Sequence, residues 1–246
     1  MMHRNATLLM CSSALIFVIS SVLLSFAQID LDITQVYLDG RQVSSGPNLL
    51  AAVLLNPTEP ATWLLLIAVW VVVLFLVVQT FREIGTARAY PVADMLLLAA
   101  AFMAGAIWPW VAQSFPLLGF MICVMMLLAM ISASSRRFSD GRLGRNPAIG
   151  IFTGWVSILT FTAFSSFVDD VTPIPPELAS LVGAVLACIA AIAIQMRIPE
   201  NAYYTITVMF AFLAIAATMI EAAPLIAVIS VLSIAALTFL LVRVTT

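Results

Sequence analysis

Hydrophobic residues (AVILMFWYC) make up 63% of the 246 positions, and charged residues (DEKR) make up 9%. Soluble domains are about 45–50% apolar and about 25% charged, so this composition excludes an aqueous fold. The ten basic residues are all arginine, and twelve acids leave a formal charge of −2, with no basic stripe to bind a nucleic acid.

The N-terminus resembles a secretory signal. Arg4 precedes an apolar run from about Ala6 to Leu24, and Ser25-Phe26-Ala27 has the shape of a cleavage site. The run is longer than the usual signal core of about 7–15 residues. We therefore expect a retained first helix.

Eight stretches are long enough to cross a membrane as helices. A helix rises about 1.5 Å per residue and the hydrocarbon core is about 30 Å thick, so a span needs about 20 apolar residues. Proline, which is tolerated in a first helical turn, stands at or near the start of every span after the first. The sequence predicts an all-α, polytopic integral membrane protein, a single domain with spans at about 6–27, 62–81, 91–112, 116–133, 148–168, 177–196, 202–221 and 223–243.

The arginines predict the orientation. Cytoplasmic loops are enriched in basic residues, and nine of the ten arginines share one side if both termini are cytoplasmic. Arg41 is the exception, in a long non-cytoplasmic loop at 28–61 that also carries acids. In this loop Asp39-Gly40 is a turn signal, and Pro47 to Leu55 could form a small extramembrane cap or an interfacial segment. We expect a bacterial inner-membrane protein, N-in and C-in.

Two connections leave the span count open. The turns near Ser114 and Ala222 are so short that each neighbouring pair could instead be one broken or re-entrant segment.

The predicted spans contain few residues that could carry out chemistry inside the bilayer. Ionisable groups within spans usually mark function, but here only Asp94 and Glu221 come close, and both suit a headgroup position. The only histidine, His3, precedes the first span, and Cys11, Cys123 and Cys188 form no metal-binding pattern. Catalytic motifs are missing. We expect no enzyme activity and no metal or covalent cofactor.

Acidic pairs on the non-cytoplasmic side, Asp30 with Asp32 and Asp169 with Asp170, could supply oxygen ligands for calcium or magnesium. Solvated loops that follow the orientation rule are the favoured interpretation.

Tryptophan and small polar residues are what the spans do carry. Trp63 and Trp70 are seven residues apart and should share a helix face, and Trp63, Trp108 and Trp110 suit interface anchors. Trp70 and Trp155 lie deeper, where packing or a ligand must explain the indole N–H. In the fifth span, glycines and hydroxyls near Trp155 are explained as well by helix packing as by a binding groove.

The segment Pro147 to Thr160, with Gly154-Trp155, resembles the P-x-x-I-x-x-G-W-x-x-x-x-T stretch of the long-form tryptophan-rich sensory proteins, the TspO/translocator-protein family. Other features stand in the family's order along the chain. A tryptophan-bearing span ends in Gln79, Trp108 and a basic loop come before Pro147, and Arg197 to Tyr203 come after Thr160. The resemblance covers about residues 60–220. Departures from the pattern are the missing tyrosine after the second-span tryptophan, Gly105 in place of asparagine and Phe210 in place of tryptophan.

The resemblance implies a helical bundle with a tryptophan-lined pocket for porphyrin-like, sterol-like or other flat hydrophobic molecules, including a carotenoid or lipid. The ligand-binding residues it implies are Trp70, Gln79, Trp108, Trp155 and Thr160. The role would be sensory, regulatory or transport-related. The expected partners are membrane lipids, a hydrophobic small molecule and a homo-oligomer or larger complex.

Two other functions compete with a ligand-binding protein. An accessory subunit of a photosynthetic or respiratory complex would explain the scarcity of polar groups. A transporter would need discontinuous helices and midplane polar groups, and Pro109 is a thin sign of these.

Overall fold

A computed structural model describes residues 2–27, 36–38, 41–43, 50, 53–54, 60–84, 90–112, 114–134 and 142–245. In this part of the chain, eight helices are long and apolar enough to cross a membrane. They are α1 (Met2–Ala27), α3 (Pro60–Arg82), α4 (Val92–Ala112), α5 (Pro116–Ser134), α6 (Pro147–Val171), α7 (Pro176–Arg197), α8 (Ala202–Met219) and α9 (Pro224–Thr245). The protein is an integral membrane protein built from these helices.

Each predicted span coincides with one helix, and the all-α architecture is confirmed. Turns at Ser114 and at 220–222 separate α4 from α5 and α8 from α9, so both short connections join true helices. Pro109 lies inside α4 without ending it.

Two boundaries differ from the prediction. Helix α6 continues to Val171 and includes Asp169 and Asp170, which the sequence analysis placed in a loop. It ends before Thr172, whose backbone is extended. Thr172 precedes Pro173, and the residue before a proline disfavours helical backbone angles. Helix α8 ends at Met219, so Glu221 lies in the following turn rather than at the end of a helix.

The long loop contains a short antiparallel hairpin, β1 (Val36–Leu38) and β2 (Arg41–Val43), in which Leu38 pairs with Arg41. The strands flank Asp39 and Gly40, the predicted turn, which lie outside the described residues. Within the expected interfacial segment, Leu50, Val53 and Leu54 are described, and all three are buried. This part of the loop packs on the bundle.

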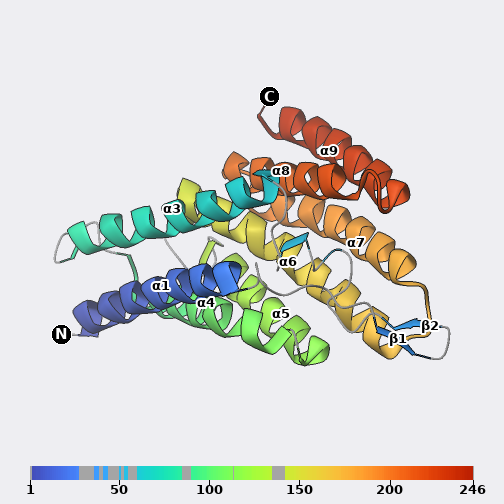
Figure 1. Cartoon of the computed structure of the whole chain (residues 1–246). Coiled ribbons are helices and arrows are strands. Elements are labelled where there is room, and N and C mark those ends of the chain that lie inside the picture. The colour runs from blue at the N-terminus through green and yellow to red at the C-terminus, as the bar shows by residue number, and fades with distance from the viewer. Residues whose placement is uncertain are drawn as a thin grey trace.

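Helix α6 lies at the centre of the bundle (Figure 1), in contact with α3, α5, α7 and α8. Helices α1, α4 and α5 pack on one side of it, and α7, α8 and α9 pack on the other. Close approach depends on small residues, as at Gly154, where a Cβ atom would lie 2.8 Å from the carbonyl oxygen of Tyr204. Gly154 thus serves helix packing, which was one of the two explanations that the sequence left open.

Large apolar side chains cover the outside of the helices. Phe239 is 72% exposed, and Leu225, Met125 and Phe75 are each exposed by more than 60%. On a water-soluble protein such a surface would be an aggregation hazard. On a membrane protein it is the surface that lipid tails solvate.

Candidate functional site

Trp70 lies against α1. Its indole Nε1 donates to Ser21 Oγ at 3.0 Å, and its ring meets that of Trp63 edge-on with centroids 6.5 Å apart. The predicted shared face of Trp63 and Trp70 is confirmed. The deep indole N–H of Trp70 is therefore satisfied by a neighbouring helix.

Trp155 belongs to an aromatic cluster in the bundle core. Its ring centroid lies 5.6 Å from that of Phe17 in α1 and 5.7 Å from that of Phe152, and Phe102 of α4 completes the cluster. All four side chains are almost fully buried. Gly105 makes room for this cluster, because a Cβ atom there would lie 2.9 Å from Phe17 Cδ2.

Trp108 and Thr160 occupy other parts of the core. Trp108 is buried near the end of α4. The hydroxyl of Thr160 donates to the carbonyl oxygens of Val156, at 2.8 Å, and of Cys123 in α5, at 3.3 Å. In contrast to Trp70, the indole N–H groups of Trp108 and Trp155 are buried without a hydrogen-bond partner.

Gln79 lies in the last turn of α3, at the end of the bundle. Its Oε1 accepts from Asn146 Nδ2 at 3.3 Å, and the same amide donates to the hydroxyl of Tyr90 at 3.2 Å. Asn146 also caps α6, because its Oδ1 accepts from the backbone N–H of Ala148 at 2.9 Å. One asparagine thus joins the end of α3 to the starts of α4 and α6.

A second asparagine connects α8 to this group. Asn201 Nδ2 donates to the carbonyl oxygens of Gly144, at 2.9 Å, and Asn146, at 3.1 Å. Its Oδ1 is buried without a partner and packs against the α-carbon of Gly150. Glycine is favoured at position 150, because a Cβ atom there would overlap the Asn201 amide unless that side chain shifted.

The same end of the bundle carries Arg82, Arg142, Arg145 and Arg197, and we call it the arginine end. Arg145 Nε and Glu200 Oε2 form an exposed ion pair of 2.6 Å. The guanidinium carbon of Arg142 lies 5.7 Å from the ring centroid of Tyr90, within range of a cation–π contact.

A pocket of about 260 Å³ opens at the arginine end. It is lined by Gln79, Glu83, Tyr90 and Arg142, which come from the end of α3 and from the segments before α4 and α6. Tyr90 is buried, Gln79 and Glu83 are half-buried, and Arg142 is exposed. Hydrogen-bonding groups, an aromatic ring and both signs of charge therefore surround one opening.

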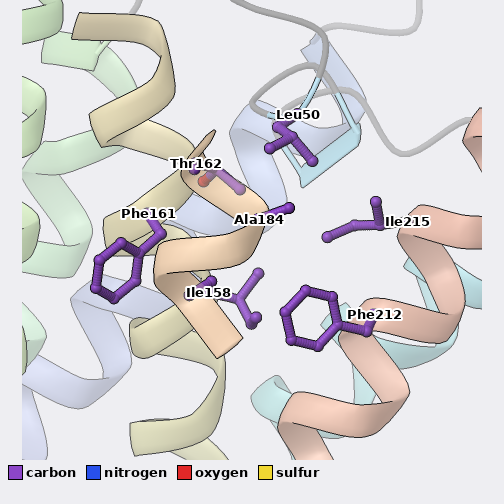
Figure 2. A pocket seen from close by; sticks show the side chains of 9 residues that line it. Leu50, Ile158, Phe161, Thr162, Ala184, Phe212 and Ile215 are labelled. Carbon is purple, nitrogen blue, oxygen red and sulfur yellow. The ribbon is translucent and has the colours of Figure 1, made fainter. Parts of the chain in front are cut away.

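Two further pockets lie elsewhere. One, of about 10 Å³, is at the limit for a single water molecule. Figure 2 shows Leu50, Ile158, Phe212 and Ile215 around it, so Leu50 of the long loop closes a crevice between α6, α7 and α8. The other lies between the starts of α7 and α9. None of the three pockets is lined by Trp70, Trp108, Trp155 or Thr160.

The five residues predicted to bind a ligand do not together line any of these three pockets. Gln79 lines a pocket, whereas Trp155, Trp108 and Thr160 are buried core residues and Trp70 packs on α1. Sequence reasoning missed Asn146, Asn201 and Tyr90. A signal was present for Asn146, which stands before Pro147 as an N-cap residue does.

Acidic groups do not gather into a metal site in the described part of the chain, where no three His, Cys, Asp or Glu residues lie together. Asp94 lies in the first turn of α4, as the sequence suggested, and its side chain is fully buried among the helices. Glu221 is exposed, as an interfacial position requires.

Fold and site together define the class: a polytopic α-helical membrane protein with an aromatic cluster in its core and a polar pocket at one end. No family model, curated protein or solved structure matches this chain.

Proposed function

We propose that this protein binds a flat, amphipathic carboxylate, of which a porphyrin is the type, at the arginine-end pocket, in a sensory, regulatory or transport-related role without a chemical step. The observation that carries the proposal is the convergence of Gln79, Tyr90 and Arg142 on one pocket. Such a mixture of an aromatic surface with a few polar groups is typical of small-molecule sites.

Each lining group has a part in this proposal. The Arg142 guanidinium pairs with the ligand carboxylate, for which its planar fork of donors is well matched. Tyr90 offers an aromatic edge, and Gln79 offers amide hydrogen bonds. The side-chain amide of Asn146 donates hydrogen bonds to both Gln79 and Tyr90, so these two side chains are preorganised for a ligand.

The apolar body of the ligand would lie along α3. Phe75 is one helical turn before Gln79, on the same face, and is 61% exposed. A volume of about 260 Å³ is small for a whole porphyrin, so its edge enters the pocket and its ring lies against Phe75 in the membrane. The aromatic cluster around Trp155 supports this arrangement, because its rings pack against one another in the core and none of them lines the pocket.

The test is a fluorescence titration of the purified full chain in detergent. Protoporphyrin IX is the probe, and its dimethyl ester, which keeps the ring but loses both carboxylates, is the matched ligand. We expect saturable binding of the acid and binding weaker by about tenfold for the ester, the effect of about 1.4 kcal/mol from one charge-assisted contact.

Paired variants locate the site. Arg142→Gln should weaken protoporphyrin binding to the level of the ester, whereas Arg145→Gln, whose arginine pairs with Glu200 outside the pocket, should not. Equal binding of acid and ester, or equal effects of the two substitutions, would overturn the proposal. If no porphyrin binds and the chain copurifies from native membranes with a defined complex, the accessory-subunit function replaces it.

A further inference from the structure

A groove of about 310 Å³ separates the starts of α7 and α9, at the end of the bundle opposite the arginines. Its walls are mostly apolar: Leu178 and Leu181 face it from α7, and Leu225 and Ile226 from α9. Leu178 and Leu225 are 47% and 66% exposed. A membrane-facing channel of this kind suits one hydrocarbon chain.

The charge at the mouth of the groove is negative. Glu177 in the first turn of α7 lines it, is exposed, and is the ionisable residue of the lining. Glu221 lies two residues before Ala223, another lining residue, and is exposed too. Among the described residues, no arginine lines the groove. The Glu177 carboxylate therefore favours a cationic group at the mouth of the groove.

We propose that this groove binds a phospholipid with a primary ammonium head group, of the phosphatidylethanolamine type. The ammonium pairs with the Glu177 carboxylate, and one acyl chain lies between Leu181 and Ile226. An anionic lipid would bring its net negative charge to the same carboxylate. This inference does not depend on the proposed porphyrin site, which lies at the other end of the bundle.

The experiment is native mass spectrometry of the full chain in detergent, supplemented with phosphatidylethanolamine or phosphatidylglycerol of identical acyl chains. We expect one ethanolamine lipid to stay bound under activation that strips the others. Its retention should exceed that of the glycerol lipid by about threefold, within the range that an interfacial ion pair supports.

Two variants test the two halves of the site. Glu177→Gln should abolish the preference between the lipids while leaving some retention of both. Leu181→Trp fills the groove and should abolish retention of both, whereas Leu232→Trp, on an exposed, lipid-facing part of α9, should leave it unchanged. Helical circular dichroism and the melting temperature show that each variant is folded.

Equal retention of the two lipids by the wild-type chain would overturn the proposal, as would an unchanged preference in Glu177→Gln. Retention that survives Leu181→Trp would place the lipid elsewhere on the surface and overturn it as well. Loss of porphyrin binding alone leaves these lipid results unaffected, so the failures of the two proposals are distinguishable.

Discussion

Asn201 donates from its Nδ2 to the carbonyl oxygen of Asn146 at 3.1 Å, and this bond joins the residue before α8 to the residue before α6. Both asparagines are buried. Asn146 in turn donates hydrogen bonds to Gln79 and Tyr90, two residues that line the pocket. Asn201 therefore supports the pocket indirectly, because it does not line the pocket itself.

Replacing Asn201 by alanine should lower the free energy of unfolding by about 2–3 kcal/mol, because the buried carbonyl of Gly144 loses its bond to the amide. The carbonyl of Asn146 retains a bond from the N–H of Gly150, which limits the loss. Unfolding by a denaturing detergent measures the change. Asn5→Ala, at an exposed position of α1, is the control and should be neutral; a small effect at both positions would show that the asparagine bond adds little.

Gly150→Ala should destabilise the fold by about 1–3 kcal/mol, the usual cost of overpacking, because the new methyl group overlaps the Asn201 side chain. The decisive measurement is a double-mutant cycle with Asn201→Ala, which removes the overlapping amide. We expect Gly150→Ala to cost clearly less in that background. An unchanged cost would mean that another contact of Gly150 is responsible.

Trp155→Ala should cost about 3–5 kcal/mol, because it leaves a cavity among Phe17, Phe102 and Phe152. Trp155→Phe should cost much less, since the indole N–H that it removes is buried without a partner. Thermal melts of the two variants rank these losses. Trp110, which is 55% exposed and donates to Ser20, provides the comparison: Trp110→Ala should cost about 1 kcal/mol. Similar losses for the alanine and phenylalanine variants of Trp155 would contradict a packing role.

Glu83→Gln should strengthen protoporphyrin IX binding by about two- to fivefold, because it removes a carboxylate from the pocket that receives an anion. The same substitution should leave the dimethyl ester unaffected, and this difference separates electrostatics from a change in pocket shape. The effect should shrink as salt is raised, since exposed charges are screened. Weaker binding of the acid would show instead that the Glu83 carboxylate accepts a hydrogen bond from the ligand.

The expected orientation can be tested with reporter fusions. Alkaline phosphatase should be active when it is fused after Ser114 or Ala222, and a fluorescent protein should mature at the C-terminus, because the arginine-rich connections are expected to be cytoplasmic. The opposite pattern at all three positions would invert the assignment and place the proposed porphyrin pocket on the non-cytoplasmic side.

The eight helices could be predicted from the sequence because each depends on a local property. A run of about 20 apolar residues must satisfy its backbone groups within itself when no water is present, so it becomes a helix wherever it is placed. Prolines then mark where helices begin: Pro116, Pro147 and Pro224 are the first residues of α5, α6 and α9. Asp39-Gly40 is a turn signal of the same local kind, and the strands on either side of it pair with each other.

Which side chains share a space was decided by the tertiary structure. Trp70, Trp155 and Thr160 looked alike as candidates, yet Trp70 meets Ser21, Trp155 meets Phe17 and Thr160 meets Cys123. Successive residues of a helix point about 100° apart, so the packing of the helices decides which neighbour each side chain meets. Asn146 and Asn201 are 55 positions apart, and only the packing of α6 against α8 brings them together. The sequence thus determined a bundle of membrane helices with an arginine-rich set of connections, and helix packing decided that its polar pocket lies at their end rather than among the tryptophans.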